Sequence, residues 1–193
     1  GTFAGLAPGQ LVLDVGSACG HFARWFHDWF GARTLGVDFV ESAVLHARRD
    51  VGSHAPARFC HHDVAAGLRW VPARSADLAT AVSVLHYLRS DSERHEAGAE
   101  PSPADGVREV ARTPCEGLRR TARTQCRAAR DMFRSVRVGG CVWIAHNGSY
   151  KGKWDPKRVW GEGYWRCCFM EEVRRGEASL QEVPEIDVFL NDT

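Results

Sequence analysis

The chain has 193 residues, of which 44% are hydrophobic and 25% are charged. This composition is typical of one globular domain with a single core and excludes wholesale disorder. The formal net charge is only +1, although the cations are 22 Arg and 3 Lys. A near-neutral chain is not built as a general nucleic-acid coat. We find no run of about 18 apolar residues and no leader-like N-terminus, so we expect no membrane-spanning helix and no signal peptide.

The cysteines are odd in number and scattered along the chain, without any CxxC pair. They stand at positions 19, 60, 115, 126, 141, 167 and 168. This pattern argues against a disulfide framework or a zinc ribbon and suits a reducing compartment. We therefore expect a cytoplasmic protein, with the reservation that a targeting segment before Gly1 would change that expectation.

Short apolar runs alternate with amphipathic stretches through most of the chain. The runs predict strands at 11–15, 34–38, 57–61, 78–85 and 141–145. The helical spacings predict helices at 21–30, 41–50 and 118–136. Short connections between such elements imply an α/β, doubly wound fold with a mostly parallel sheet and helices on both faces.

Two regions depart from this alternation. Residues 89–117 are rich in Ser, Glu, Ala, Gly and Pro, which predicts an exposed insertion. The C-terminal region offers one clear strand candidate at 186–190 and a poorer one at 165–169. The predicted helix at 118–136 carries many arginines, which either form a solvated amphipathic face or bind phosphate or RNA.

Residues with binding chemistry follow the predicted strands, and an open parallel sheet binds its ligands at that edge. Gly16 and Gly20 follow the first strand and permit a tight turn that approaches a ligand closely. Asp38 ends the second strand, where an acid suits ribose hydroxyls. Asp63 follows the third strand and suits an exocyclic amine. Together these residues predict a site for a nucleoside-containing ligand.

Five pieces of sequence carry a family resemblance. They are Leu-Asp-Val-Gly-Ser-Ala-Cys-Gly at 13–20, Val-Asp at 37–38, His-Asp-Val at 62–64, the strand and turn at 77–88, and Arg-Val-Gly-Gly-Cys-Val at 137–142. Their order and spacing form a stronger signal than any single piece.

In these pieces the chain resembles the class I S-adenosylmethionine-dependent methyltransferases of the small-molecule type, over residues 8–146. The resemblance implies a Rossmann-like fold and one methyltransferase domain over 1–193. Within it, 8–88 would be the cofactor-binding half, 89–117 the insertion, and 118–193 the half with substrate-side elements. Two departures are Ala18, where a glycine is usual, and Val138, where a proline is usual.

The resemblance also implies roles in binding S-adenosylmethionine. Asp14 would hold the amino group of the methionine part, directly or through water, and Ser83 would contribute its backbone nearby. Asp38 would accept the ribose hydroxyls and Asp63 the adenine amine. The remaining positions are the loop residues Gly16, Ser17, Ala18 and Gly20, with Phe39 and Val64 beside the adenine.

Two histidines are candidates for acting on the acceptor. His86 follows the fourth strand, where a base or an orienting group is useful, and His146 follows the fifth. The alternatives are packing for His86 and a polar loop pair for His146. His61 and His62 are metal-capable, but neighbours on a strand point to opposite faces, so we expect no metal site.

These observations favour methyl transfer to a small-molecule acceptor. A nucleic-acid methyltransferase is one alternative, although the residues after the fourth strand lack the Asn/Asp-Pro-Pro-aromatic motif of base-amine methylation. A nucleotide-dependent oxidoreductase is another, although Ala18 and Cys19 break its G-x-G-x-x-G register. The third alternative is a non-catalytic cofactor-binding module.

Overall fold

The computed structural model of the protein describes residues 5–88, 123–145, 165 and 167–178. The chain divides into two compact units, one made of Gly1–Val107 with Ala122–Asn147 and the other of Arg108–Thr121 with Gly148–Thr193. The sheet and the predicted site belong to the first unit. The assignment of one methyltransferase domain to the whole chain stays a prediction.

The first unit is built on a five-stranded sheet in which each neighbouring pair is parallel. The spatial order is β3-β2-β1-β4-β5. The strands are β1 (Leu11–Val15), β2 (Arg33–Asp38), β3 (Ala57–His61), β4 (Ala76–Val82) and β5 (Val136–Ala145). The order reverses between β1 and β4, and ligands bind at such a reversal in open α/β sheets.

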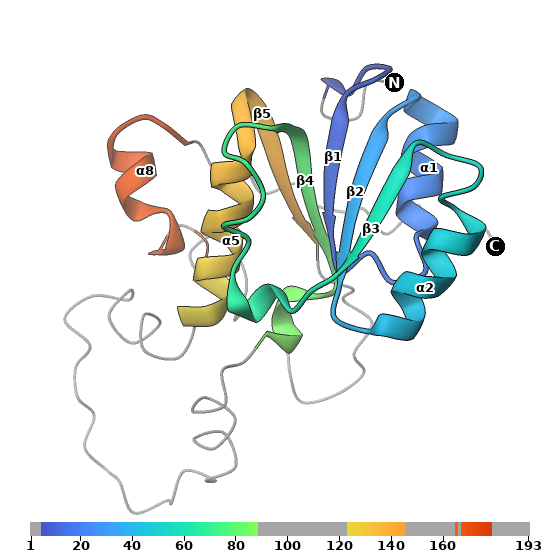
Figure 1. Ribbon diagram of the computed structural model, residues 1–193. Helices are drawn as coiled ribbons and strands as arrows, with labels where there is room; N and C mark the ends of the chain where they lie inside the picture. The colour runs from blue at the N-terminus through green and yellow to red at the C-terminus, as the bar shows by residue number, and fades with distance from the viewer. Residues whose placement is uncertain (1–4, 89–122, 146–164, 166, 179–193) are drawn as a thin grey trace, which may run out of the picture. The chain divides into compact units, whose positions relative to one another are not determined.

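Helices cover both faces of this sheet, as the sequence predicts. Figure 1 shows α1 (His21–Phe30) and α2 (Glu41–Asp50) on one face and α5 (Arg123–Ser135) on the other. Two single-turn helices, η2 (Val64–Ala66) and η3 (Leu85–Tyr87), follow β3 and β4. A further helix, α8 (Met170–Arg174), belongs to the second unit.

The central strand β1 is the most deeply buried part of the sheet. Val12, Leu13 and Val15 are fully buried. Phe26 of α1 packs in one cluster with Val12 and Leu78. Full burial of a side chain such as Phe26 contributes about 1.5–3 kcal/mol. This rigid centre fixes the position of the loop that leaves β1.

One aromatic ring explains two glycines beside that loop. Gly36 of β2 lies next to both Asp14 and Phe59 in the sheet register. A Cβ atom on Gly36 would lie 2.5 Å from the Phe59 ring and 2.8 Å from Ser17 Oγ. A Cβ atom on Gly20 would lie 2.9 Å from the same ring. The ring of Phe59 thus requires glycine at both positions.

Two strand boundaries differ from the sequence prediction by three residues or more. The fourth strand ends at Val82 rather than 85, because Ser83 adopts a left-handed conformation with φ 52°. The fifth strand starts at Val136, and a bulge lies between the pairs Ala76–Val136 and Leu78–Cys141. The bulge absorbs residues 137–140, which the sequence prediction leaves between the helix at 118–136 and the strand at 141–145.

The C-terminal predictions have mixed outcomes. Trp165, Cys167 and Cys168 are helical, so the weaker strand candidate at 165–169 is wrong. The candidate strand 186–190 and the predicted insertion 89–117 lie outside the described residues.

The cysteine pattern needs correction as well. Cys19, Cys60 and Cys141 are free, but three others, Cys126, Cys167 and Cys168, are disulfide-bonded. The spacing along the chain did not reveal this, because only the fold decides which cysteines meet.

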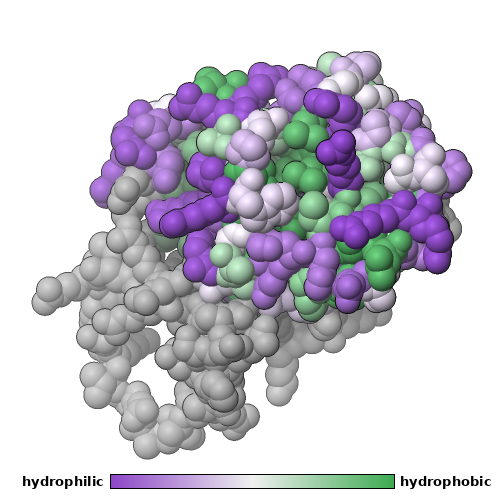
Figure 2. Space-filling model, viewed as in Figure 1, coloured by the Kyte–Doolittle hydropathy of each residue, from purple (hydrophilic) through white to green (hydrophobic). Residues whose placement is uncertain are grey.

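The described surface mixes polar and apolar side chains. In the view of Figure 2, hydrophilic residues are interspersed with smaller apolar groups. The most exposed large apolar residues include Trp29, Phe39, Tyr87 and Val138. Among the described helices, none is long and apolar enough to cross a membrane.

Candidate functional site

A small hollow of about 20 Å³ lies at the carboxyl ends of the central strands. Five of the residues predicted to hold the cofactor line it, and they come from three separate strand ends. The complete lining is Gly16, Val37, Asp38, Phe39, His62, Asp63, Val64, Val84 and Leu88.

The glycine-containing loop at 16–20 is tied to the end of β2. The backbone N–H groups of Gly16 and Ser17 donate to the Val37 carbonyl at 2.8 and 3.2 Å. Gly16 has φ 77°, and a Cβ atom there would lie 2.5 Å from Val84, so only glycine fits. Ala18 also has a positive φ, of 46°, at the position where a glycine is usual in the family.

Asp38 organises this loop as well as facing the hollow. Its two carboxylate oxygens accept the backbone N–H groups of Ala18 and Val40, each at 2.8 Å. The residue is only 8% exposed. Because each carboxylate oxygen has a second lone pair, Asp38 can still accept ribose hydroxyls. The sequence predicted an acid for the ligand but not its structural role.

Asp63 and its neighbours form the side of the hollow after β3. Asp63 is exposed and caps η2 by accepting the Ala65 N–H at 2.8 Å. His62 donates from Nε2 to the Gly67 carbonyl at 2.7 Å, whereas His61 donates to the Phe39 carbonyl at 2.9 Å. The two rings therefore bind to different loops, one after β2 and the other after η2.

Phe39 and Val64 present different surfaces to this hollow. Phe39 is 61% exposed, whereas Val64 is buried. An exposed ring beside a buried aliphatic side chain suits a flat, apolar base. Within the described part of the chain, no three His, Cys, Asp or Glu residues gather into a group that could hold a metal.

Asp14 is buried in the sheet next to the loop and does not line the hollow. Its Oδ1 accepts the Thr80 hydroxyl at 2.8 Å, while its Oδ2 is buried without a hydrogen-bond partner. The pKa of Asp14 is raised to about 6. Burial is the largest cause; the hydrogen bond from Thr80 acts against it, and the nearby charge of Asp38 acts with it. A buried acid with one unpaired oxygen suits a cationic partner such as an ammonium group.

The remaining predicted residues have varied positions. Ser17 is buried and its Oγ has no hydrogen-bond partner. Gly20 caps the start of α1 with φ 85°. The Ser83 backbone N–H donates to the Ala145 carbonyl at 2.8 Å. His86 lies in η3, but its side chain is outside the described set, and His146 lies outside the described residues.

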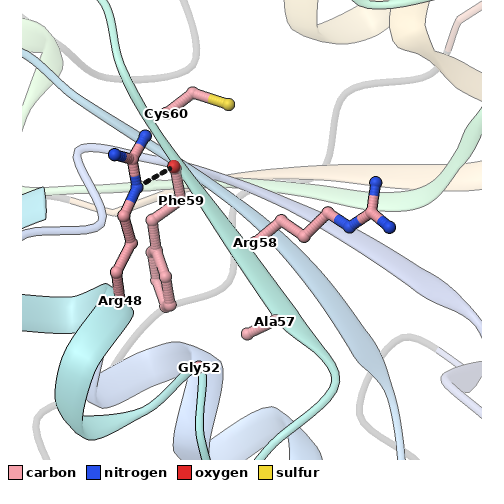
Figure 3. Close-up of a pocket in the computed structure, with 6 residues that line it drawn as sticks. All are labelled: Arg48, Gly52, Ala57, Arg58, Phe59 and Cys60. Carbon is pink, nitrogen blue, oxygen red and sulfur yellow. Dashed lines mark hydrogen bonds between the residues drawn. The ribbon is translucent and has the colours of Figure 1, made fainter.

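A second, larger hollow of about 360 Å³ runs along the outer edge of β3 in the described sheet. Figure 3 shows the Arg48 side chain reaching the Phe59 carbonyl, to which its Nε donates at 2.9 Å. Arg58 extends away from Arg48 in the same view. None of the predicted cofactor residues lines this hollow.

Sequence reasoning missed five contributors to the site. Four of them line the hollow and fall within stretches that were recognised as motifs, namely Val37, His62, Val84 and Leu88. Gly36 leaves room for Phe59 and Ser17 beside the loop. A glycine within a predicted strand is the signal that could have indicated such a close approach.

The comparisons with known proteins bear on the same part of the chain. Residues 12–100 match a family model described as a methyltransferase domain. A search of curated proteins by sequence finds no match.

Several solved structures are similar in fold. A TehB-like S-adenosylmethionine-dependent methyltransferase from Corynebacterium glutamicum has 18% identity and a TM-score of 0.55, over 86% of this chain and 67% of that one. An S-adenosylmethionine-dependent methyltransferase from Mesorhizobium loti has 23% identity and a TM-score of 0.46, over 71% of this chain and 46% of that one.

A third similar structure is a complex between the Haloferax volcanii Trm112 methyltransferase activator and a methyltransferase. It has 17% identity and a TM-score of 0.48, over 70% of this chain and 46% of that one. The chain thus spans less than half the length of the Haloferax and Mesorhizobium proteins.

A parallel sheet in this strand order, with a glycine loop after β1 and acids after β2 and β3, is typical of proteins that bind a nucleoside-containing cofactor. Residues 12–100 thus match a methyltransferase domain, and the described sheet has the fold of an S-adenosylmethionine-dependent methyltransferase. S-adenosylmethionine is the cofactor of this class.

Proposed function

We propose that the protein transfers the methyl group of S-adenosylmethionine to a small-molecule acceptor. The observation that carries the proposal is the hollow where Gly16, Asp38, Phe39 and Asp63 meet from the ends of three strands. These residues match the binding needs of a methionine part, a ribose and an adenine in that order.

The side chains present fit this cofactor. The unpaired Asp14 Oδ2 is a buried acceptor for the methionine ammonium, directly or through water. Asp38 retains lone pairs for the ribose, and the exposed Phe39 ring offers a face to the adenine. Asp63 uses one oxygen to cap η2 and keeps the other for the adenine amine. S-adenosylmethionine, when bound, supplies a methyl group on a positively charged sulfur.

Positioning is the main task left to the protein in such a transfer. Holding an acceptor in line with the methyl group contributes on the order of 7–11 kcal/mol in favourable intramolecular cases. We propose that His86 and His146 orient the acceptor or accept its proton, since both follow strands at the cofactor edge.

The arginines of α5 give little support to a nucleic-acid acceptor. Arg134 donates to two carbonyls of the protein's own backbone, and Arg127 donates to a third. Guanidinium groups that are occupied in this way are less available to phosphates. The small-molecule acceptor is therefore the proposal we prefer.

A transfer experiment tests this function. The protein is incubated with S-adenosylmethionine labelled in the methyl group and with an extract of small metabolites, with total RNA in a parallel sample. We expect a labelled low-mass product that the Asp38→Ala variant does not form. Label in RNA alone would contradict the small-molecule acceptor, and label in neither sample would contradict transfer to the acceptors offered.

A further inference from the structure

Two charged side chains of α5 form hydrogen bonds with the loop at 67–71, which follows Asp63 and Val64 in the sequence. Asp131 Oδ2 accepts the Leu68 N–H at 2.7 Å. Arg134 Nη2 donates to the carbonyls of Leu68 and Val71, both at 2.9 Å. Side chains of α5 thus form hydrogen bonds with one donor and two acceptors of the loop backbone.

The two side chains act from the same side of the helix. Asp131 and Arg134 are three residues apart, with 4.0 Å between Arg134 Nε and Asp131 Oδ1. Their side chains are 13% and 37% exposed, respectively. Hydrogen bonds in which one partner is ionised are stronger than neutral ones, especially when shielded from water.

The loop fits closely against the helix. Leu68 and Val71 are buried. Gly67 has φ 97°, and a Cβ atom there would lie 3.1 Å from Asp131 Oδ2. Glycine therefore allows the loop backbone to approach the carboxylate.

The same loop reaches the cofactor hollow at its other end. His62, which lines the hollow, donates to the Gly67 carbonyl at 2.7 Å. Asp63 and Val64 lie between these two residues in sequence and also line the hollow. Their helix η2 has only three residues, too few to hold its own geometry.

We propose that Asp131 and Arg134 form a clamp that positions Asp63 and Val64 for the adenine of the cofactor. This inference rests on the proposed function, since it names residues that act on the same site through the loop. Asp131 and Arg134 are positioning residues, because they contact the loop backbone and do not line the hollow.

Hydrogen exchange of the cofactor-free protein tests the first half of the proposal. The Arg134→Ala variant is compared with Arg137→Ala, a matched control. Arg137 pairs with Asp77 near the start of β4, away from the carboxyl ends of the strands. We expect Arg134→Ala to lose amide protection at 64–71 while the sheet keeps its protection, and Arg137→Ala to leave 64–71 unchanged. Unchanged protection at 64–71 in Arg134→Ala would overturn the clamp.

Ligand selectivity tests the second half. Binding of S-adenosylhomocysteine is compared with that of its inosine analogue, which lacks the adenine amine. For Arg134→Ala we expect S-adenosylhomocysteine to bind about tenfold more weakly, with the preference over the analogue lost. The Arg134→Lys variant should recover part of the preference, because its ammonium group keeps the charge and can still donate a hydrogen bond.

A double-mutant cycle between Arg134 and Asp63 separates a failure of the clamp from a failure of the proposed function. In the Asp63→Ala background, Arg134→Ala should cost little further affinity, since both act through one contact. Fully additive losses, or unchanged selectivity in Arg134→Ala, would overturn the positioning role. If the wild-type protein did not bind S-adenosylhomocysteine at all, the proposed function would fail, whereas the exchange result would still decide whether the clamp exists.

Discussion

Replacing Asp14 by Asn should change how the stability of the protein depends on pH. Asp14 is buried, and its Oδ2 has no hydrogen-bond partner. The Asn side chain keeps an oxygen that accepts the Thr80 hydroxyl but carries no charge at any pH. The comparison therefore isolates the cost of burying an ionised carboxylate.

The structure sets the size of the effect. Burial raises the pKa of Asp14 from 3.8 to about 6. Because the folded-state pKa is raised, this group's contribution to stability is fully present below pH 3.8 and is lost as the pH rises through about 6. The whole shift corresponds to about 3 kcal/mol. Between about pH 5 and about pH 8, linkage gives about 1.4 kcal/mol of this change.

Urea unfolding followed by tryptophan fluorescence measures this difference. The free energy of unfolding of Asp14→Asn, relative to wild type, should rise by about 1.4 kcal/mol between about pH 5 and about pH 8. Asp28→Asn is the control for the loss of a carboxylate that is not buried, because the Asp28 side chain is 55% exposed. A constant difference between Asp14→Asn and wild type would refute the buried, raised-pKa carboxyl.

Three further substitutions have definite expected outcomes. Asp38→Ala should keep the fold but lower the melting temperature and abolish cofactor binding in calorimetry, because it leaves the Ala18 N–H and another loop N–H without an acceptor, at about 1–3 kcal/mol each. Gly36→Ala should lower the free energy of unfolding by about 1–3 kcal/mol in urea, since its Cβ would lie 2.5 Å from the Phe59 ring; an unchanged midpoint would contradict the packing. Burial raises the pKa of Asp77, but hydrogen bonds from a backbone N–H and an arginine outweigh it, so the pKa is lowered. Asp77→Asn should therefore destabilise the protein at neutral pH, with a difference that shrinks as acid protonates the wild-type carboxyl.

The order of the elements was predictable because local patterns determine it. Each local pattern is consistent with one type of element in a parallel α/β fold. The apolar runs around Leu13 and Val37 predict strands, and the amphipathic stretches at 21–30 and 41–50 predict helices. That the candidate residues lie close together was also predictable, since the carboxyl ends of parallel strands meet at one edge. Gly16, Asp38 and Asp63 accordingly line one hollow.

What the sequence did not reveal depends on contacts between distant segments. The end of the fourth strand depends on the left-handed Ser83, which no apolar pattern indicates. The arginines of 118–136 suggested either a solvated face or a phosphate site, whereas Arg134 binds the backbone of a loop more than 60 positions away. The sequence alone does not distinguish these roles of an arginine, because they depend on which groups the fold brings near it.

Titration calorimetry of the wild-type protein tests the central claim most directly. S-adenosylmethionine, S-adenosylhomocysteine and NAD are titrated separately into the protein and into Asp38→Ala. The account predicts saturable binding of the two adenosyl ligands to wild type, no binding of NAD, and no binding of any of them to Asp38→Ala. Binding of NAD without S-adenosylmethionine, or equal affinity in Asp38→Ala, would contradict the account.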